Sequence, residues 1–154
     1  IVGSSSSGKY GLINISDHLF KNFSKQVIKK KPILKIYGSD YNTPDGSCIR
    51  DFIHVSDIAE IHEKVLNKVN NLNKSITLNC GYNQGISVLQ VAKEFKNQSK
   101  KKVKIIKVRK RPGDLGKIIA SNTKLNNFIK WKPKFKSLSN MVKSSILWEQ
   151  KLLK

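Results

Sequence analysis

The 154-residue sequence predicts an α/β fold, and three observations support that prediction. Short apolar runs with a period of two, which is typical of strands, alternate with longer stretches in which apolar residues recur every three or four positions, which is typical of helices. Glycine-containing polar clusters follow the strand-like runs and would end them. The length suits one domain with its own hydrophobic core, so we treat residues 1–154 as a single unit.

The predicted strands and helices alternate along the chain. The period-two pattern predicts strands over 33–37, 48–55, 75–79 and 103–108. Amphipathic stripes predict helices over 17–30, from 56 or 57 to 69, from 88 onward, from 122 to 128, and across the C-terminal residues, where the stripe is Leu138, Met141, Val142, Ile146 and Leu153. The side chains expected to cap the first four helices are Ser16, Ser56 or Asp57, Ser87 and Ser121.

The composition is strongly basic, with 30 Lys and Arg against 10 Asp and Glu and a net charge of +20. Such a charge invites a nucleic-acid or anionic-membrane partner. The lysines are scattered, however, with runs only at 29–31 and 100–102, and arginine, the better reader of phosphates and bases, is rare. No zinc-finger, helix-turn-helix or RNA-binding-sheet motif occurs. We therefore expect no nucleic-acid partner, and coding bias explains the abundant Lys, Asn and Ile better than a binding surface does.

The sequence lacks signals for secretion, membrane insertion and metal binding. It has neither an apolar run of about 18 residues nor an apolar N-terminal segment, so we expect a cytoplasmic location and no membrane partner. Cys48 and Cys80 are too few and too far apart for a zinc site and are expected to be buried apolar fillers. The chain begins with Ile1 rather than methionine, so we expect a fragment of a longer protein.

Residues 3–9, GSSSSGK, match the phosphate-loop pattern Gly-x-x-x-x-Gly-Lys. In that motif a strand precedes the loop, a helix follows it, and a Ser or Thr comes next to hold magnesium. Here only Ile1 and Val2 precede the loop, and Tyr10 follows it. A flexible Ser/Gly loop is therefore the better interpretation.

The stretch 37–55, YGSDYNTPDGSCIRDFIHV, contains a turn between two strand-like runs. Within Asn42-Thr43-Pro44-Asp45-Gly46, the proline sets φ and the glycine accepts a positive φ. The chain is therefore expected to reverse at this point.

Arginine occurs at three positions, which are candidate phosphate contacts: Arg50, Arg109 and Arg111. A planar guanidinium can donate two hydrogen bonds to one phosphate, at about 1.5–3 kcal/mol for each charged bond. On a returning strand, Arg50 would share a face with Phe52 and His54. For Arg50 alone, a surface position or a salt bridge to Asp51 is the alternative.

A second basic turn, RKRPGD, follows the strand predicted over 103–108. Arg111 can fork onto phosphate oxygens, and Asp114 can accept hydrogen bonds from sugar hydroxyls. Such a pair fits a nucleoside diphosphate. The alternative is an exposed basic turn with a local ion pair, worth about 0–1 kcal/mol.

The segment YGSDYNTPDGSCIRDFIHVSD closely resembles the signature segment in the C-terminal half of UDP-glucose 4-epimerases, members of the extended short-chain dehydrogenase/reductase group. The resemblance continues through NCGYNQGISVLQV and KRPGDLGKIIASNTKLNNFIKWKP, so that it covers essentially the whole chain. It implies the substrate-binding C-terminal portion of a Rossmann-type enzyme. The Gly-x-x-Gly-x-x-Gly turn and Tyr-x-x-x-Lys pair of the family's NAD half do not occur here. The resemblance therefore implies that NAD and the catalytic residues belong to a missing N-terminal half.

The resemblance also implies roles for individual residues in binding a UDP-sugar. Lys35 and Tyr37 would lie near the uracil, Arg50 and Arg111 on the diphosphate, and Asp114 on the ribose. The walls of the site would be His18, Leu19, Phe52 and Val88. Phe52 and Ile118 stand where family members have a tyrosine, so two hydroxyl contacts are absent. The interpretation requires Arg50 and Arg111 to converge on one pyrophosphate.

The activity implied by the resemblance is the interconversion of UDP-glucose and UDP-galactose through a 4-keto intermediate with bound NAD. The intact enzyme is expected to be a homodimer, and this chain alone is expected to be inactive. Two alternatives remain open. One is another NAD-dependent nucleotide-sugar enzyme, such as a 4,6-dehydratase or a uronate epimerase, and the other is a basic nucleic-acid-binding module.

Overall fold

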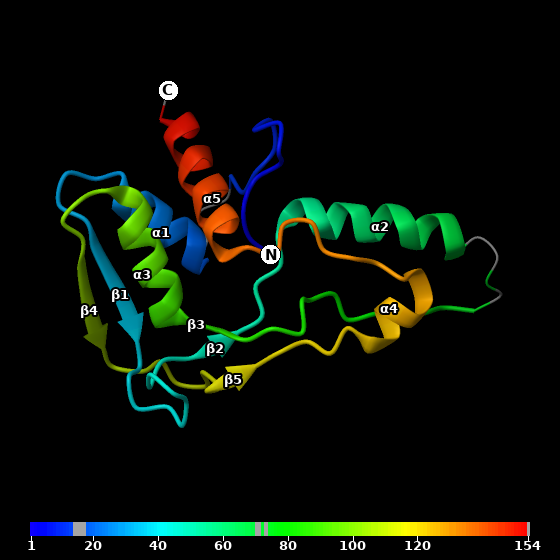
Figure 1. The fold of residues 1–154 in the computed structure, drawn as a ribbon. Coiled ribbons are helices and arrows are strands. Elements are labelled where there is room, and N and C mark those ends of the chain that lie inside the picture. Colours follow the sequence, from blue (N-terminus) through cyan, green and yellow to red (C-terminus); the bar gives the residue numbers. More distant parts are fainter. Residues whose placement is uncertain (14–17, 70–71, 73, 154) are drawn as a thin grey trace.

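The structure is a computed structural model that describes residues 1–13, 18–69, 72 and 74–153. Its elements alternate between helices and strands, which confirms the predicted α/β class (Figure 1). In chain order they are α1 (Leu19–Val27), β1 (Ile33–Tyr37), β2 (Ile49–Arg50), α2 (Val55–Val69), β3 (Ile86–Ser87), α3 (Val88–Ser99), β4 (Lys104–Val108), β5 (Lys117–Ile118), α4 (Thr123–Ile129) and α5 (Leu138–Leu152). No helix among the described residues is long and apolar enough to cross a membrane.

The main lobe is a parallel pair of strands covered by three helices. Strands β1 and β4 pair from Ile33 opposite Lys104 to Tyr37 opposite Val108, as the period-two patterns predict. The alternation of β1 turns Leu34 and Ile36 into the core and leaves the other face open. Figure 1 shows α1 and α3 beside this pair, and α5 packs against both helices.

Aromatic side chains fill the centre of this lobe. The ring of Phe95 from α3 lies edge-on to both Phe20 and Phe23 of α1, at centroid distances of 5.4 and 5.6 Å. All three rings are buried. Each edge-to-face pair of this kind contributes about 0.5–1.5 kcal/mol beyond the burial of its apolar area.

A second, smaller sheet has the strand order β3-β2-β5. Strand β2 runs antiparallel to β3 and parallel to β5. The strand predicted over 48–55 was wrong in length, because only Ile49 and Arg50 join the ladder. After Arg50 the chain changes partners: Val2 N donates to Ile53 O at 2.8 Å, and Val55 N donates to Val2 O at 2.8 Å. Helix α2 then begins at Val55.

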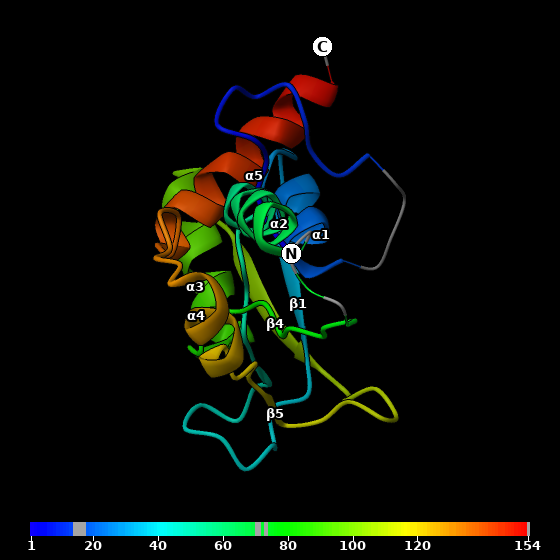
Figure 2. The ribbon, with the colours of Figure 1, turned by 90° about the vertical axis from the view of Figure 1, so that its right-hand side faces the viewer.

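An arm extends from the main lobe and consists of α2, the extended segment 74–80 and α4 (Figures 1 and 2). The strand predicted over 75–79 is not formed, because none of the described strands pairs with it. The period of apolar residues in α2 predicts an inward stripe that includes Ile61 and Leu66, and this prediction is only partly correct. Ile61 is 2% exposed, whereas Leu66 is 62% exposed, since little of the described chain covers that part of the helix.

The predicted helix caps were partly correct. Ser87 caps α3 in a capping box: its hydroxyl accepts from Gln90 N at 3.0 Å, and the Gln90 side chain accepts from Ser87 N at 2.8 Å. The predicted cap at Ser121 was wrong, because the N-cap of α4 is Asn122. The side-chain amide of Asn122 donates to Gly81 O at 3.0 Å. The expected cap Ser16 lies outside the described residues.

The ends of the first and last helices also differ from the predicted stripes. Leu153 follows the last residue of α5 and is 74% exposed, so it is not part of the buried stripe. The predicted core residues Met141, Val142 and Ile146 are buried. Helix α1 ends at Val27, three residues before the predicted end, and Lys29 and Lys30 belong to the following loop.

Candidate functional site

The candidate site lies where β1 and β4 end. Because the two strands are parallel, their carboxyl ends lie side by side, which is where open α/β sheets bind ligands. Tyr37 closes β1, and its side chain is 42% exposed. The loop after β4 places the Arg111 guanidinium 5.1 Å from the centre of the Tyr37 ring.

Arg111 is also paired with Asp114. Its Nε donates to Asp114 Oδ2 at 2.9 Å, so the local ion pair of the alternative interpretation is formed. The Arg111 side chain is 54% exposed, and a pair at this exposure contributes only about 0–1 kcal/mol. Displacement of the carboxylate by a phosphate group would therefore cost little free energy.

An open pocket of about 530 Å³ surrounds this pair, lined by Tyr41, Arg109, Lys110, Arg111, Pro112, Gly113 and Asp114. Lys110 Nζ lies 3.1 Å from Asp40 Oδ2 and 5.8 Å from the centre of the Tyr41 ring, so it links the loops after β1 and β4. The hydrogen bond from Lys110 lowers the pKa of Asp40. Loss of water contact, the neighbouring Cys48 thiol and nearby carboxylates raise the pKa of Tyr41 to about 12.

The predicted reversal of the chain after β1 is present. Thr43 O accepts from Gly46 N at 3.1 Å, and Gly46 O accepts from Tyr41 N at 3.1 Å. Gly46 has a φ of +75°, and a Cβ at this position would lie 2.2 Å from Ser39 O. Only glycine fits this turn without strain.

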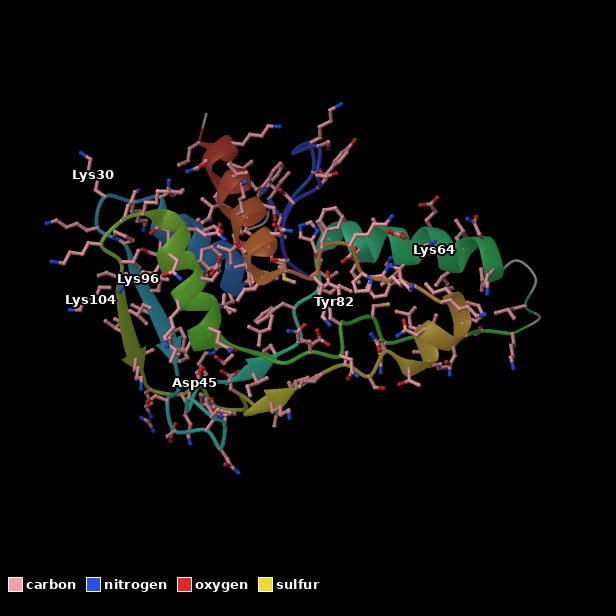
Figure 3. All side chains as sticks on the ribbon, viewed as in Figure 1. Lys30, Asp45, Lys64, Tyr82, Lys96 and Lys104 are labelled. Atoms are coloured by element: carbon pink, nitrogen blue, oxygen red, sulfur yellow. The ribbon has the colours of Figure 1, made fainter. Side chains whose placement is uncertain are left out.

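Asp45 fixes this turn to the start of α3 (Figure 3), a contact that the sequence analysis did not predict. Its Oδ1 accepts from Ser47 N at 2.9 Å and Ser47 Oγ at 2.7 Å, and its Oδ2 accepts from Ser87 Oγ. Burial alone would raise the pKa of Asp45, but the hydrogen bonds from Ser87 and Ser47 outweigh it and lower the pKa. An aspartate two residues before a serine within a Pro-Asp-Gly-Ser turn is the pattern that would have indicated this contact.

Three of the predicted contact residues lie on β2, just after it and at the start of α3. Arg50, on β2, is half-buried, and its Nη1 donates to the backbone oxygen of Ile49 at 2.9 Å. Phe52 is half-buried against the core, with its ring 5.0 Å from that of Phe20. Val88 is the first residue of α3 and is half-buried. Its backbone N donates to Cys48 O at 2.9 Å.

His18 and Leu19 lie at the start of α1, and both are half-buried. His18 lines a larger apolar pocket of about 820 Å³, together with Phe20 and the N-terminal residues. Burial and the nearby N-terminal amino group lower the pKa of His18. Lys35 is exposed on the same face of β1 as Tyr37.

The structure thus brings together Tyr37, Arg111 and Asp114. Arg50 does not line either of these two pockets among the described residues, so its convergence with Arg111 stays a prediction.

A buried hydrogen-bond network holds the chain that follows Arg50. Asp57 is fully buried and accepts from Tyr82 Oη at 2.5 Å, Lys134 N at 3.1 Å and Phe135 N at 3.0 Å. Tyr82, labelled in Figure 3, also accepts from His54 N at 3.1 Å. Burial raises the pKa of Tyr82 well above its ordinary value, so it remains a donor. The network joins the end of the signature segment to the chain entering α5.

The GSSSSGK segment forms a loop, as expected. Ser5 N donates to Tyr10 O at 2.9 Å, and Gly8 N donates to Ser5 O at 2.8 Å. No helix follows within residues 9–13, so the structural context of a phosphate loop is absent from this described range. Among the described residues, no group of three or more His, Cys, Asp or Glu side chains forms a potential metal site.

Comparison with known proteins identifies the family. A family profile described as GDP-mannose 4,6 dehydratase matches residues 9–144, which is most of the chain. The chain belongs to this family.

Relatives of the family with known names include UDP-glucose 4-epimerases, which confirms the resemblance seen in the sequence. The enzyme of Azospirillum brasilense is 35% identical over 153 residues, covering 99% of this chain and 44% of that protein. The enzyme of Streptococcus mutans serotype c is 35% identical over 115 residues, covering 75% of this chain and 34% of that protein. The chain therefore spans less than half the length of these relatives.

Solved structures of the family confirm the fold. The UDP-glucose-4-epimerase of Stenotrophomonas maltophila, with bound NAD and formylated UDP-arabinopyranose, matches with a TM-score of 0.91 and 28% identity, covering 99% of this chain and 46% of that one. The Bifidobacterium longum enzyme, in complex with NAD⁺ and UDP, matches with a TM-score of 0.85 and 30% identity, covering 97% and 45%. The described residues therefore have the fold of a partial Rossmann-type enzyme.

Proposed function

We propose that this chain forms the UDP-sugar-binding part of a UDP-glucose 4-epimerase. The observation that carries the proposal is the cluster of Tyr37, Arg111 and Asp114 at the carboxyl ends of β1 and β4. An exposed ring, a guanidinium and a carboxylate are the groups that a base, a diphosphate and a ribose respectively require. The named epimerase relatives, two of which are solved with uridine nucleotides, support the choice of ligand.

In the bound state the uracil would stack on Tyr37 beside the backbone of Lys35. Arg111 would turn from Asp114 to the diphosphate, which frees the carboxylate for the ribose hydroxyls. This exchange replaces a half-exposed ion pair with a charge-assisted contact to phosphate. Arg50 would supply the second guanidinium, and the walls would be His18, Leu19, Phe52 and Val88.

The residues of this chain do not fit an NAD site. β1 leads through Gly38 into the loop 39–48, and β4 leads into the loop 109–116, so neither strand meets the helix N-terminus that a dinucleotide fingerprint requires. The 154 residues also contain no Tyr-x-x-x-Lys pair. We propose that NAD and the proton-transferring groups belong to the remainder of the enzyme and that this chain alone is inactive. The role of the residues described here is to bind and orient the nucleotide.

The family profile gives a second candidate. Its description, GDP-mannose 4,6 dehydratase, favours another sugar-nucleotide reaction on the same scaffold. A panel of UDP- and GDP-sugars, tested with the full-length enzyme, separates the two: epimerisation at C4 supports the first proposal, and loss of water to a 4-keto-6-deoxy sugar supports the second. The expected homodimer and cytoplasmic location stay predictions.

Calorimetric titration of the purified protein with UDP tests the binding site. Arg111→Met should weaken UDP binding by about tenfold or more, because charged hydrogen bonds of about 1.5–3 kcal/mol are lost. Lys124→Met is the control, since it removes the same charge from an exposed position that lines neither of the two pockets. Uridine, which has no phosphate, should bind more weakly than UDP and should not distinguish the two variants.

Two outcomes would contradict this binding site. One is an equal loss of affinity in the Arg111 and Lys124 variants, which would show a diffuse effect of charge. The other is tight binding of duplex DNA with a steep salt dependence and no detectable binding of UDP, which would favour the nucleic-acid-binding module over a nucleotide-sugar site.

A further inference from the structure

Tyr41, a residue to which the sequence analysis assigned no role, lies between the two loops of the candidate nucleotide site. It belongs to the loop 39–48 after β1, and its side chain lines the open pocket formed by the loop 109–116 after β4. Both loops extend beyond the carboxyl ends of these strands (Figures 1 and 2). Tyr41 is half-buried and, among the described residues, lies outside the hydrophobic core. Core packing therefore does not explain its position.

The first contact of the Tyr41 ring is with the end of β1. Gly38 follows Tyr37, and a Cβ added to Gly38 would lie 2.2 Å from Tyr41 Cε2. Only a residue without a side chain leaves room for the ring here. Gly38 N also donates to Val108 O at 2.9 Å, so the ring packs where the pairing of β1 with β4 ends.

The next two contacts are with the ends of the loop that carries Arg111 and Asp114. Lys110, next to Arg111, has its Nζ 5.8 Å from the centre of the Tyr41 ring. Gly116 comes two residues after Asp114, and a Cβ there would lie 3.5 Å from Tyr41 Cδ1, at van der Waals distance. Because the ring contacts both ends of this loop, it restrains the part between them.

Tyr41 is itself fixed to the main lobe. Its N donates to Gly46 O at 3.1 Å, and its O accepts from Thr43 N at 2.8 Å. The carboxylate of Asp45 attaches the same turn to Ser87, the N-cap of α3. The ring therefore connects the start of α3 to the loop after β4.

Two other features of these loops contribute less to their relative position. The ion pair of Lys110 with Asp40 is 54% and 64% exposed, and pairs at this exposure contribute little. The Tyr41 hydroxyl is buried and forms no hydrogen bond within the described part of the chain, although the Cys48 thiol is close. The ring, rather than its hydroxyl, is therefore the part of Tyr41 that links the loops.

We propose that Tyr41 is a positioning residue of the UDP-sugar site, whose ring sets the spacing of the three residues that would contact the nucleotide. These residues are Tyr37, Arg111 and Asp114. The inference rests on the proposed function for its ligand and on the ring contacts alone for the position of the loop. Without the ring, Arg111 would no longer be held 5.1 Å from the centre of the Tyr37 ring. A base would still stack on Tyr37, whereas a diphosphate would lose a preorganised guanidinium.

The test compares Tyr41→Leu, Tyr41→Phe and Phe128→Leu in calorimetric titrations of the purified protein with UDP and with uridine. Y41L should bind UDP about tenfold more weakly or worse, the loss expected when one charged hydrogen bond is misplaced, and should bind uridine as the wild type does. Y41F keeps the ring and should retain the wild-type affinity for UDP. Phe128 on α4 is the matched control, because its ring is also half-buried with a lysine over it, Lys68 Nζ at 5.7 Å, and it lines neither of the two pockets. F128L should bind UDP as the wild type does.

Hydrogen exchange followed by mass spectrometry tests the position of the loop without a ligand. Gly38 N donates to Val108 O at 2.9 Å and Ile49 N donates to Gly116 O at 2.8 Å, so these two amides report on the two ends of the loop after β4. Both amides should exchange faster in Y41L than in the wild type, and at the wild-type rate in Y41F and F128L. If Y41L does not fold, Y41M replaces it with a longer apolar side chain and the same expected results.

Unchanged UDP affinity in Y41L, or unchanged exchange of both amides, would overturn the inference. An equal loss of UDP affinity in Y41F would also overturn it, because the hydroxyl would then be the group that matters. So would an equal loss of UDP and uridine affinity in Y41L, because the ring would then bind the base. If the wild type binds no UDP, the proposed function fails; faster exchange in Y41L alone then still supports the positioning of the loop, and unchanged exchange overturns it.

Discussion

Removal of the buried charge of Lys21 should destabilise the protein strongly. Lys21 on α1 and Glu149 on α5 are 3% and 6% exposed, their charged atoms are 2.8 Å apart, and Lys21 also donates to Leu12 O at 2.6 Å. Lys21→Met would leave the Glu149 carboxylate buried without its partner, at a cost of about 3–5 kcal/mol. Urea unfolding followed by circular dichroism measures this change in the free energy of unfolding.

The double variant K21M/E149L distinguishes this explanation from simple loss of packing. Replacing both charges with apolar side chains of similar volume removes the stranded carboxylate, so most of the stability should return, and it can exceed that of the wild type by about 1–4 kcal/mol. Lys64→Met is the control, because the Lys64–Glu60 pair on α2 is exposed and 3.7 Å apart, and it should change stability by about 0–1 kcal/mol. The reasoning fails if Lys21→Met is as mild as Lys64→Met, or if the double variant is as unstable as the single one.

Three further predictions concern the turn and the buried network. Asp45→Asn should destabilise the turn by about 1–3 kcal/mol, since one charged acceptor of three hydrogen bonds is lost, and chemical denaturation measures the difference. The pKa of Asp45 in the folded protein is lowered from 3.8, so its contribution to the free energy of unfolding is present above pH 3.8 and should be lost as the pH falls through the folded pKa. If the wild type stays more stable than D45N by the same amount below the folded pKa, this explanation is wrong. Gly46→Ala should cost about 1–3 kcal/mol, because its φ is +75° and the new Cβ would meet Ser39 O; an unchanged melting temperature would refute that strain. Tyr82→Phe should cost about 1–3 kcal/mol by removing a donor to Asp57 and an acceptor for His54 N, as measured by urea unfolding, and a neutral result would show that water replaces the hydroxyl.

Features with a local cause could be predicted from the sequence. The strand 33–37 is confirmed residue for residue, and the strand predicted over 103–108 begins one residue later than expected. In 33–37, period-two alternation also determines which side chains are buried, whereas exposure does not alternate along β4. The turn closed at Gly46 and the cap at Ser87 depend on residues three or four positions apart, so their patterns are visible in the sequence.

Features that depend on distant partners could not be predicted in this way. The run 48–55 has the composition of a strand, but the chain leaves the small sheet after Arg50. The cause is a distant segment, since the backbone of Val2, near the N-terminus, is hydrogen-bonded to Ile53 and Val55. The run 75–79 alternates as a strand should, yet no described strand pairs with it. A period in the sequence reports which face is apolar and does not report whether a neighbouring strand exists.

In the candidate site, too, contacts between residues close in sequence could be predicted, and contacts between distant residues could not. The pair of Arg111 and Asp114 is three residues apart, and the sequence indicated both its functional and its purely local interpretation. The contact of Arg111 with Tyr37 joins the loop after β4 to the last residue of β1 and required the parallel pairing of these strands. The buried pair of Lys21 and Glu149 gave no sequence signal, because nothing in either helix marks a lysine or glutamate as internal.

The extended segment 74–80 in the arm has a practical consequence for handling the protein. None of the described strands pairs with its backbone, whose donors and acceptors could therefore bond to an extended segment of a neighbouring chain. We expect concentrated samples of the 154-residue chain to self-associate through this segment, and a proline at one of its exposed positions, such as Thr77, to improve their solubility.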